Sequence, residues 1–263
     1  MRADKYFAEK FGSRTKAAEA IEKGLVLVNG KAIKPKSEVS EEDLVTFLQA
    51  ESAFVSNGGY KLERAIKTFH LDCVNKTFAD IGASTGGFTD CLLQNGAAKV
   101  YAIDVGESLL HTQLQNDSRV ITMDNTNARY LKKKDFSENI DGVVTDVSFI
   151  SLRLIFPVIK EILSPNGFAV VLIKPQFECE NKNIGKSGIV SPSAHAGIVE
   201  KVLQYANESG LYPYGIVNAP IRKGKNIEYV LHVQTDVKYA KPNKVIVEEV
   251  KKLVRHNSLG ELI

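Results

Sequence analysis

Four charged side chains stand at the ends of apolar segments, where open α/β sheets place their ligands. Asp146 closes the run DGVVTD, and Lys174 closes FAVVLIK. Glu228 stands at the start of the last long apolar run, and Lys61 follows a Gly-Gly pair. Burying a charge is costly unless an opposite charge pairs with it, so we expect the two amines and two carboxylates to converge. The alternative is four independent charges, each at the end of its own strand. In a converged set, burial and a neighbouring cation can lower the pKa of a lysine enough for it to act as a base near neutral pH.

The stretch DIGASTGGFTD (80–90) predicts a tight turn between an apolar strand and a helix, with glycines that let backbone approach a ligand closely. A triphosphate loop would need GxxxxGK[ST], and a nicotinamide loop favours GxGxxG, whereas the spacing here is GxxxGG. S-adenosylmethionine carries a sulfonium and no pyrophosphate, so it suits a looser turn with an acid beside it. Asp104 ends the next apolar run and could accept hydrogen bonds from the ribose hydroxyls of this cofactor. The candidate cofactor-binding residues are Asp80, Gly82, Ser84, Thr85, Gly86, Gly87, Phe88, Asp104 and Asp124.

From Tyr60 onward, segments with strand and helix patterns alternate along the chain. The apolar strands are nearly continuous, which indicates an α/β domain with a mostly parallel sheet covered by helices on both faces. We expect this domain to span residues 60–237, after a linker at 56–59. Residues 238–263 are expected to form a C-terminal helical tail.

Residues 1–55 form a smaller block with an α+β pattern. Two helical segments precede an Asn29-Gly30 hairpin signal, and Ser13 is placed to cap the second helix. The stretches MRADKYFAEK, SRTKAAEAIEKGLVLVNGKAI and KPKSEV resemble the S4-like RNA-binding domain, named after a small-subunit ribosomal protein. In that family, paired helices present basic side chains to RNA, although acids interleave the cations here and solvated surface charges are the alternative. The resemblance implies RNA contacts by Arg2, Lys5, Arg14, Lys16 and Lys31.

The second domain resembles the FtsJ-like ribose 2′-O-methyltransferases. With the front block, the whole chain resembles the TlyA-type family, whose members are described both as haemolysins and as ribosomal-RNA cytidine 2′-O-methyltransferases. The stretches that carry this resemblance are SNGGYKLERA, DIGASTGGFTDCLLQNGA, TDVSFISL, IKPQFE and GKNIEYVLH. The resemblance implies a class I S-adenosylmethionine methyltransferase with a Rossmann-like, mostly parallel seven-stranded sheet. It also implies a catalytic tetrad of Lys61, Asp146, Lys174 and Glu228.

Within that tetrad, we expect Lys174 to face the ribose hydroxyl, with Lys61 as its neighbour. Lys174 would act as a base or, if it stays protonated, would stabilise developing alkoxide charge; the sequence leaves both roles open. Asp146 would orient Lys174, and Glu228 would position Lys61 or the ribose.

The chain departs from the family pattern at three places. Asn57 and Asn125 stand where the family commonly has Arg, and Lys225 stands where it has Gly before Asn-Ile-Glu. These departures concern the linker and RNA contacts and leave the tetrad intact.

Two further features could contact RNA. The cations of RKGK lie close to Glu228 in sequence and are candidates for binding phosphates, namely Arg222, Lys223 and Lys225. Phe149 and Phe177 follow the strands that end at Asp146 and Lys174. We expect both rings to pack in the core, with stacking on a base as the alternative.

The composition, with 44% apolar and 25% charged residues, is that of a globular protein, and a net charge of +3 is only weakly indicative of a nucleic-acid partner. The three cysteines are widely spaced and the histidines show no metal-binding pattern, so neither a disulfide framework nor a metal is expected. The charged start has no signal segment, and the longest apolar run is far shorter than the about 20 residues of a membrane helix. We therefore expect a cytoplasmic protein, and we expect a monomer because no extended apolar stripe suggests self-association. The family resemblance implies that it acts on ribosomal RNA or ribosomal subunits. The alternatives are a membrane-active haemolysin and a non-catalytic RNA-binding factor.

Overall fold

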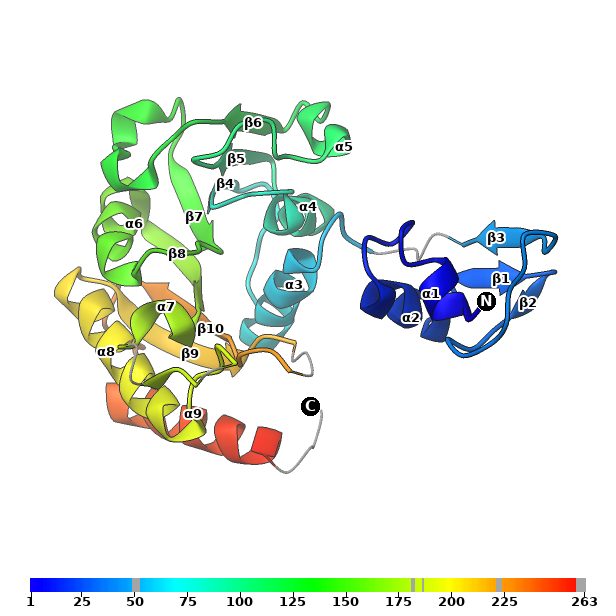
Figure 1. Ribbon diagram of the computed structural model, residues 1–263. Coiled ribbons are helices and arrows are strands. Elements are labelled where there is room, and N and C mark those ends of the chain that lie inside the picture. The colour runs from blue at the N-terminus through cyan, green and yellow to red at the C-terminus, as the bar shows by residue number, and fades with distance from the viewer. Residues whose placement is uncertain (49–52, 181–182, 186, 221–223, 259–263) are drawn as a thin grey trace. The chain divides into compact units, whose positions relative to one another are not determined.

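The computed structural model describes residues 1–48, 53–180, 183–185, 187–220 and 224–258 (Figure 1). The chain forms two compact units, Met1–Ala53 and Phe54–Ile263. Each unit has a separate hydrophobic core.

The first unit packs two helices against a small antiparallel sheet. Ser13 caps the second helix, since its Oγ accepts the backbone N–H of Lys16 at 3.2 Å. Asn29 and Gly30 both have positive φ, as the tight hairpin between β1 and β2 requires. The strand order is β2-β1-β3. The elements are α1 (Ala3–Tyr6), α2 (Arg14–Glu22), β1 (Val26–Val28), β2 (Lys31–Ala32) and β3 (Val45–Phe47).

The second unit is built on a seven-stranded sheet with the order β6-β5-β4-β7-β8-β10-β9 (Figure 1). The five strands from β6 to β8 are parallel to one another, whereas β10 is antiparallel to both β8 and β9. This order is that of the mostly parallel sheet expected from the sequence. The strands are β4 (Thr77–Ile81), β5 (Lys99–Ile103), β6 (Val120–Met123), β7 (Ile140–Thr145), β8 (Leu163–Ile173), β9 (Tyr212–Asn218) and β10 (Tyr229–Gln234).

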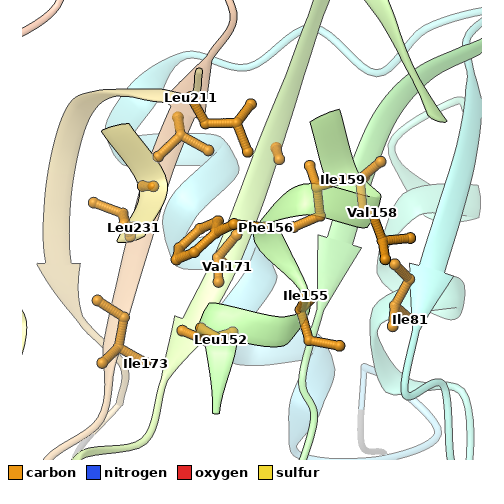
Figure 2. Close-up of a cluster of buried hydrophobic side chains, with 14 of the residues drawn as sticks. Ile81, Leu152, Ile155, Phe156, Val158, Ile159, Val171, Ile173, Leu211 and Leu231 are labelled. Carbon is orange, nitrogen blue, oxygen red and sulfur yellow. The ribbon is translucent and has the colours of Figure 1, made fainter. Parts of the chain in front are cut away.

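Helices cover both faces of this sheet. On one face, α3, α4 and α5 bury apolar side chains against Phe78 and Val144. On the other face, α6, α8 and α9 pack on a cluster that includes Phe156 and Val171 (Figure 2). The helices are α3 (Gly58–Phe69), α4 (Gly87–Gln94), α5 (Thr112–Gln115), α6 (Phe156–Ile162), α7 (Pro175–Glu178), α8 (His195–Glu208) and α9 (Asn243–Ser258), with short 3-10 turns η1 (Ala128–Tyr130), η2 (Lys133–Asp135), η3 (Leu152–Leu154) and η5 (Pro192–Ala194).

Two segments at the expected domain boundaries have a defined place in the second unit. The residues expected to form a C-terminal helical tail include α9, whose Ile246 and Val250 are fully buried in the core of this unit. The Gly-Gly pair at the end of the expected linker begins α3 at Gly58. Gly59 is buried there, and a Cβ on it would lie 2.2 Å from the Phe54 ring. Glycine is therefore required by packing at this position.

The topology brings several polar segments to one edge of the sheet. The parallel strands β4, β5, β7 and β8 all end at this edge, so the glycine turn, Asp104, Asp146 and Lys174 follow neighbouring strands. Because β10 is antiparallel to β8 and Tyr229 pairs with Ile173, β10 begins where β8 ends. Glu228 therefore lies at the same edge.

Candidate active site

The structure brings the four charged side chains of the expected tetrad together. Lys61 Nζ lies 2.8 Å from Glu228 Oε2 and 3.3 Å from Asp146 Oδ2. Lys174 Nζ lies 2.5 Å from Asp146 Oδ1. The order in space is thus Glu228, Lys61, Asp146, Lys174, with amines and carboxylates alternating.

Alternating charges explain how this cluster can be buried. The four side chains keep only 11–20% of their surface exposed, a degree of burial that is costly for unpaired charges. Each amine contacts at least one carboxylate, and Lys174 also donates to Ser148 Oγ at 2.8 Å. The two amines and two carboxylates therefore form one group with balanced charges, in which each side chain is held by its neighbours. This group lies where the parallel strands end.

Close packing of two helix starts places Lys61 beside the glycine turn. Lys61 lies in the first turn of α3, and Gly87 begins α4. A Cβ on Gly87 would lie 2.2 Å from Ser56 Oγ and 2.9 Å from the Gly59 nitrogen. Only a glycine at this position lets the two helix starts approach so closely.

A cavity of about 700 Å³ opens at the ends of β4, β5 and β7. Its polar side is fixed by Asp104, whose two carboxylate oxygens accept the backbone N–H groups of Ser84 at 2.8 Å and Gly106 at 2.9 Å. Gly82 approaches the cavity with a φ of +82°, a conformation that glycine adopts without strain. The lining residues include Gly82, Ser84, Ile103, Asp104, Leu109, Asn127, Arg129, Asp146, Ser148, Phe149, Ile150 and Leu154.

A smaller cavity of about 190 Å³ shares part of this wall and reaches the tetrad. Gly82, Ser84, Asp146 and Ser148 line both cavities. The smaller one also includes Lys174 and the expected cofactor residues Thr85, Gly87 and Phe88.

The two cavities fit the chemistry of S-adenosylmethionine. The larger has the volume and apolar walls of a nucleoside site and a carboxylate at the end of the second strand for ribose hydroxyls. The smaller is lined by backbone of the glycine turn and reaches the charged tetrad.

Three residues expected to bind the cofactor line neither cavity. Asp80 is fully buried beneath the turn, where its Oδ2 accepts the Thr89 hydroxyl at 2.7 Å, and burial raises its pKa to about 7. Gly86 faces helix α5, since a Cβ on it would lie 2.3 Å from Leu114. Asp124 accepts the Ser108 backbone N–H at 3.0 Å and so holds a neighbouring loop. These three residues contact other parts of the protein and hold the turn and the neighbouring loop in place.

A third cavity, of about 390 Å³, opens on the other side of the tetrad. Lys61 and Glu228 line it together with Gln176, Asn226 and the expected RNA-binding residue Lys225. Arg222 and Lys223 lie outside the described residues. The charged group thus stands between a cavity suited to the cofactor and a second, polar cavity.

Sequence reasoning missed several residues at this site. Ser148 accepts a hydrogen bond from Lys174, and Arg129 lines the large cavity. Neither residue lies in the glycine turn, and neither is a charged residue at the end of a strand. The expectation of core packing is wrong for Phe149, which is 90% exposed and has a φ of +61°. Its ring lies 4.9 Å from that of the half-buried Phe177. The sequence alone did not predict that this ring is exposed beside the cavity, because an aromatic residue after a strand is also typical of a core.

The five cations expected to bind RNA in the first unit are all exposed, namely Arg2, Lys5, Arg14, Lys16 and Lys31. Two of them are held by one carboxylate, since Asp4 pairs with Arg2 at 2.8 Å and with Arg14 at 3.1 Å. The hydrogen bond from Arg2 is the largest cause that keeps the pKa of Asp4 below its usual value. This pairing orients two guanidinium groups on one surface of the unit.

Comparison with known families matches both units of the chain. The family model described as FtsJ-like methyltransferase matches residues 54–235, and the S4 domain model matches residues 1–45. Hemolysin A from Brachyspira hyodysenteriae is 41% identical over 241 residues, which cover 88% of this chain and 99% of that protein. The 16S/23S rRNA (cytidine-2′-O)-methyltransferase TlyA from Mycobacterium tuberculosis is 37% identical over 246 residues, which cover 92% of each chain.

Solved structures show the same relationship. A protein from Streptococcus thermophilus, described as a candidate hemolysin, matches with a TM-score of 0.74 at 37% identity and covers 98% of both chains. A protein from Listeria monocytogenes, described as a candidate S-adenosylmethionine-dependent methyltransferase, matches with a TM-score of 0.52 at only 13% identity over 69% of this chain and 99% of that chain. This second likeness concerns the fold alone.

Proposed function

The chain belongs to the TlyA-type family, in which an S4 domain precedes an FtsJ-like methyltransferase domain, and we propose that it methylates the 2′-hydroxyl of a cytidine in ribosomal RNA with S-adenosylmethionine as donor. The observation that carries this proposal is the alternating set of Glu228, Lys61, Asp146 and Lys174, which stands between the two adjoining cavities that fit the cofactor and the polar cavity. Such an arrangement could hold a ribose hydroxyl beside a bound methyl donor and either accept its proton or stabilise the charge that develops on its oxygen.

When bound, S-adenosylmethionine supplies a methyl group that its sulfonium has already activated. The protein must therefore align the ribose hydroxyl and help its proton leave. Lys174 lines the smaller cavity and is held by Asp146 and Ser148, so its amine is fixed in direction. Either the neutral amine accepts the hydroxyl proton, or the ammonium stabilises the negative charge that develops on the oxygen.

Lys61 and Glu228 act on the other side of the same group. Asp146 contacts both lysines, so the position of Lys61 and the position of Lys174 are linked through a shared carboxylate. Glu228 holds Lys61 at 2.8 Å and lines the polar cavity, where it can also accept a hydrogen bond from the ribose.

RNA would be bound through surfaces on both units. In the first unit, the exposed cations around Arg2 and Arg14 provide contacts to phosphates, as the S4 family suggests. In the second unit, Lys225 lines the polar cavity. An enzyme with this substrate would work in the cytoplasm.

The experiment that tests the proposal is to incubate the purified protein with labelled S-adenosylmethionine and separate small and large ribosomal subunits. We expect label in RNA, and digestion to nucleosides should give 2′-O-methylcytidine. Label confined to bases or to protein would contradict the proposal.

Membrane damage is a second candidate, favoured by the name of the Brachyspira relative. Among the residues that the structure describes, no helix is both long enough and apolar enough to span a bilayer. Release of a trapped dye from liposomes by the purified protein tests this candidate directly. Leakage at the concentrations that support methylation would favour it.

A further inference from the structure

A single buried carboxylate joins the two segments that follow Asp146 and Lys174. Glu178 ends α7, the short helix directly after Lys174, and is only 9% exposed. Its Oε1 accepts the backbone N–H of Leu152 at 2.7 Å, and its Oε2 accepts the hydroxyl of Ser151 at 2.7 Å. Ser151 and Leu152 end the loop that follows Asp146, so Glu178 clamps this loop to the helix after β8.

Burying the Glu178 carboxylate costs free energy, so its hydrogen bonds to the loop must offset that cost. Burial is the largest cause that raises the pKa of Glu178, and the bond from Leu152 acts in the opposite direction. A buried carboxylate is tolerated only when hydrogen bonds replace its lost water. Here both hydrogen bonds come from the end of one loop.

That loop serves the cofactor cavity and the tetrad at once. All five residues from Val147 to Ser151 line the large cavity. Within the loop, Ser148 accepts a hydrogen bond from Lys174, and Phe149 has a strained φ of +61°. A conformation of this kind persists only when the surrounding structure holds both ends of the segment.

We propose that Glu178 is a positioning residue for methyl transfer: it fixes loop 147–152 so that Ser148 and Asp146 meet Lys174 while the same loop forms a wall of the cofactor cavity. This inference rests on the proposed function. It implies that the hydrogen bonds of Glu178 hold both the loop that lines the cofactor cavity and the amine of Lys174. Removing these hydrogen bonds should therefore affect cofactor binding and catalysis together.

The test compares two substitutions of Glu178. Glu178→Ala leaves the Leu152 N–H without an acceptor and frees the loop, so kcat should fall by about a hundredfold. The dissociation constant for S-adenosylmethionine should rise by about tenfold, because the loop lines its cavity. Glu178→Gln keeps an oxygen for the Leu152 N–H and presents its amide to a lone pair of Ser151 Oγ, so it should restore both quantities to within about threefold of wild type.

A matched control separates positioning from loss of stability. Asp141 also accepts a backbone N–H from a neighbouring segment, that of Thr77 at 2.9 Å, but it lies at the opposite end of β7 from Asp146. Asp141→Ala should lower Tm and leave kcat and cofactor affinity unchanged. Glu178→Ala is compared with it at temperatures well below both melting transitions.

Two results would overturn the role of Glu178. One is wild-type kcat and cofactor affinity in Glu178→Ala. The other is equal loss of activity in Glu178→Ala and Asp141→Ala at equal loss of Tm. Cofactor affinity is measured by calorimetry without RNA, so this arm decides about the clamp even if the RNA substrate has been assigned wrongly.

Discussion

Replacing Asp80 by Asn removes a carboxyl that the structure buries completely beneath the glycine turn. Burial is the main reason why its pKa rises from 3.8 to about 7, and the nearby Asp146 charge raises it further. The folded chain therefore binds more protons than the unfolded chain between these two values, and the free energy of unfolding falls as pH rises through this window. The Asn side chain cannot ionise, so Asp80→Asn lacks this loss.

The expected size follows from the shift. One pKa unit corresponds to about 1.4 kcal/mol, so the two units between pH 5 and pH 7 amount to about 3 kcal/mol of unfolding free energy. Urea unfolding of wild type and Asp80→Asn at pH 5 and pH 8 measures this difference, because the contributions of all other groups cancel between the two proteins. The variant should gain stability relative to wild type at the higher pH.

A control without a pH effect in this window is available in the same unit. The hydrogen bond from Lys76 is the largest cause that lowers the pKa of the exposed Asp72 below 3.8, so this carboxylate contributes stability above its unfolded pKa and loses it only at lower pH. Asp72→Asn should therefore be less stable than wild type by the same amount at pH 5 and at pH 8. Parallel pH curves for wild type and Asp80→Asn would show that Asp80 ionises freely, and the account of its burial would be wrong.

The remaining predictions concern catalysis, cofactor binding, packing and RNA. Lys174→Ala should abolish methyl transfer while the calorimetric dissociation constant for the cofactor stays within about threefold of wild type; an equal loss of both would indicate a structural role. Asp104→Ala leaves two backbone N–H groups without their acceptor and should weaken cofactor binding by about 1–3 kcal/mol in the same titration, with unchanged affinity as the contrary result. Gly87→Ala places a Cβ 2.2 Å from a serine hydroxyl before α3 and should lower Tm in thermal unfolding, whereas an unchanged Tm would speak against this close packing. Lys16→Glu should weaken binding of a ribosomal-RNA fragment and reduce the slope of log affinity against log salt by about 1–2, and a constant slope would exclude this face from the interface.

The parts of the site that follow from strand patterns could be predicted from the sequence. Near-continuous apolar runs identified the strands that end at Asp104, Asp146 and Lys174, and parallel strands bring such ends to one edge. Glu228 was harder, because it begins a strand. Its place depends on β10 running antiparallel to β8, which no local pattern specifies.

The remaining features depend on tertiary packing. Asp80 and Gly86 belong to the glycine turn in sequence but face the protein interior, because the turn has two sides and the sequence does not show which residues face the ligand. Phe149 has an apolar side chain of the kind that usually packs in a core. Its backbone has a positive φ, however, and its ring is exposed. The amphipathic pattern of α9 predicted a helix but not its burial, since the partner surface is formed by α8 and β9, far away in sequence.

The measurement that tests the central claim most directly is single-turnover methylation of ribosomal subunits by wild type and Asp146→Asn. Asp146 is the carboxylate that contacts both lysines, so its loss breaks the charged group in the middle. The variant should still bind S-adenosylmethionine but form 2′-O-methylcytidine at least about a hundredfold more slowly than wild type. Methylation at the wild-type rate would mean that the two amines and two carboxylates do not work as one unit.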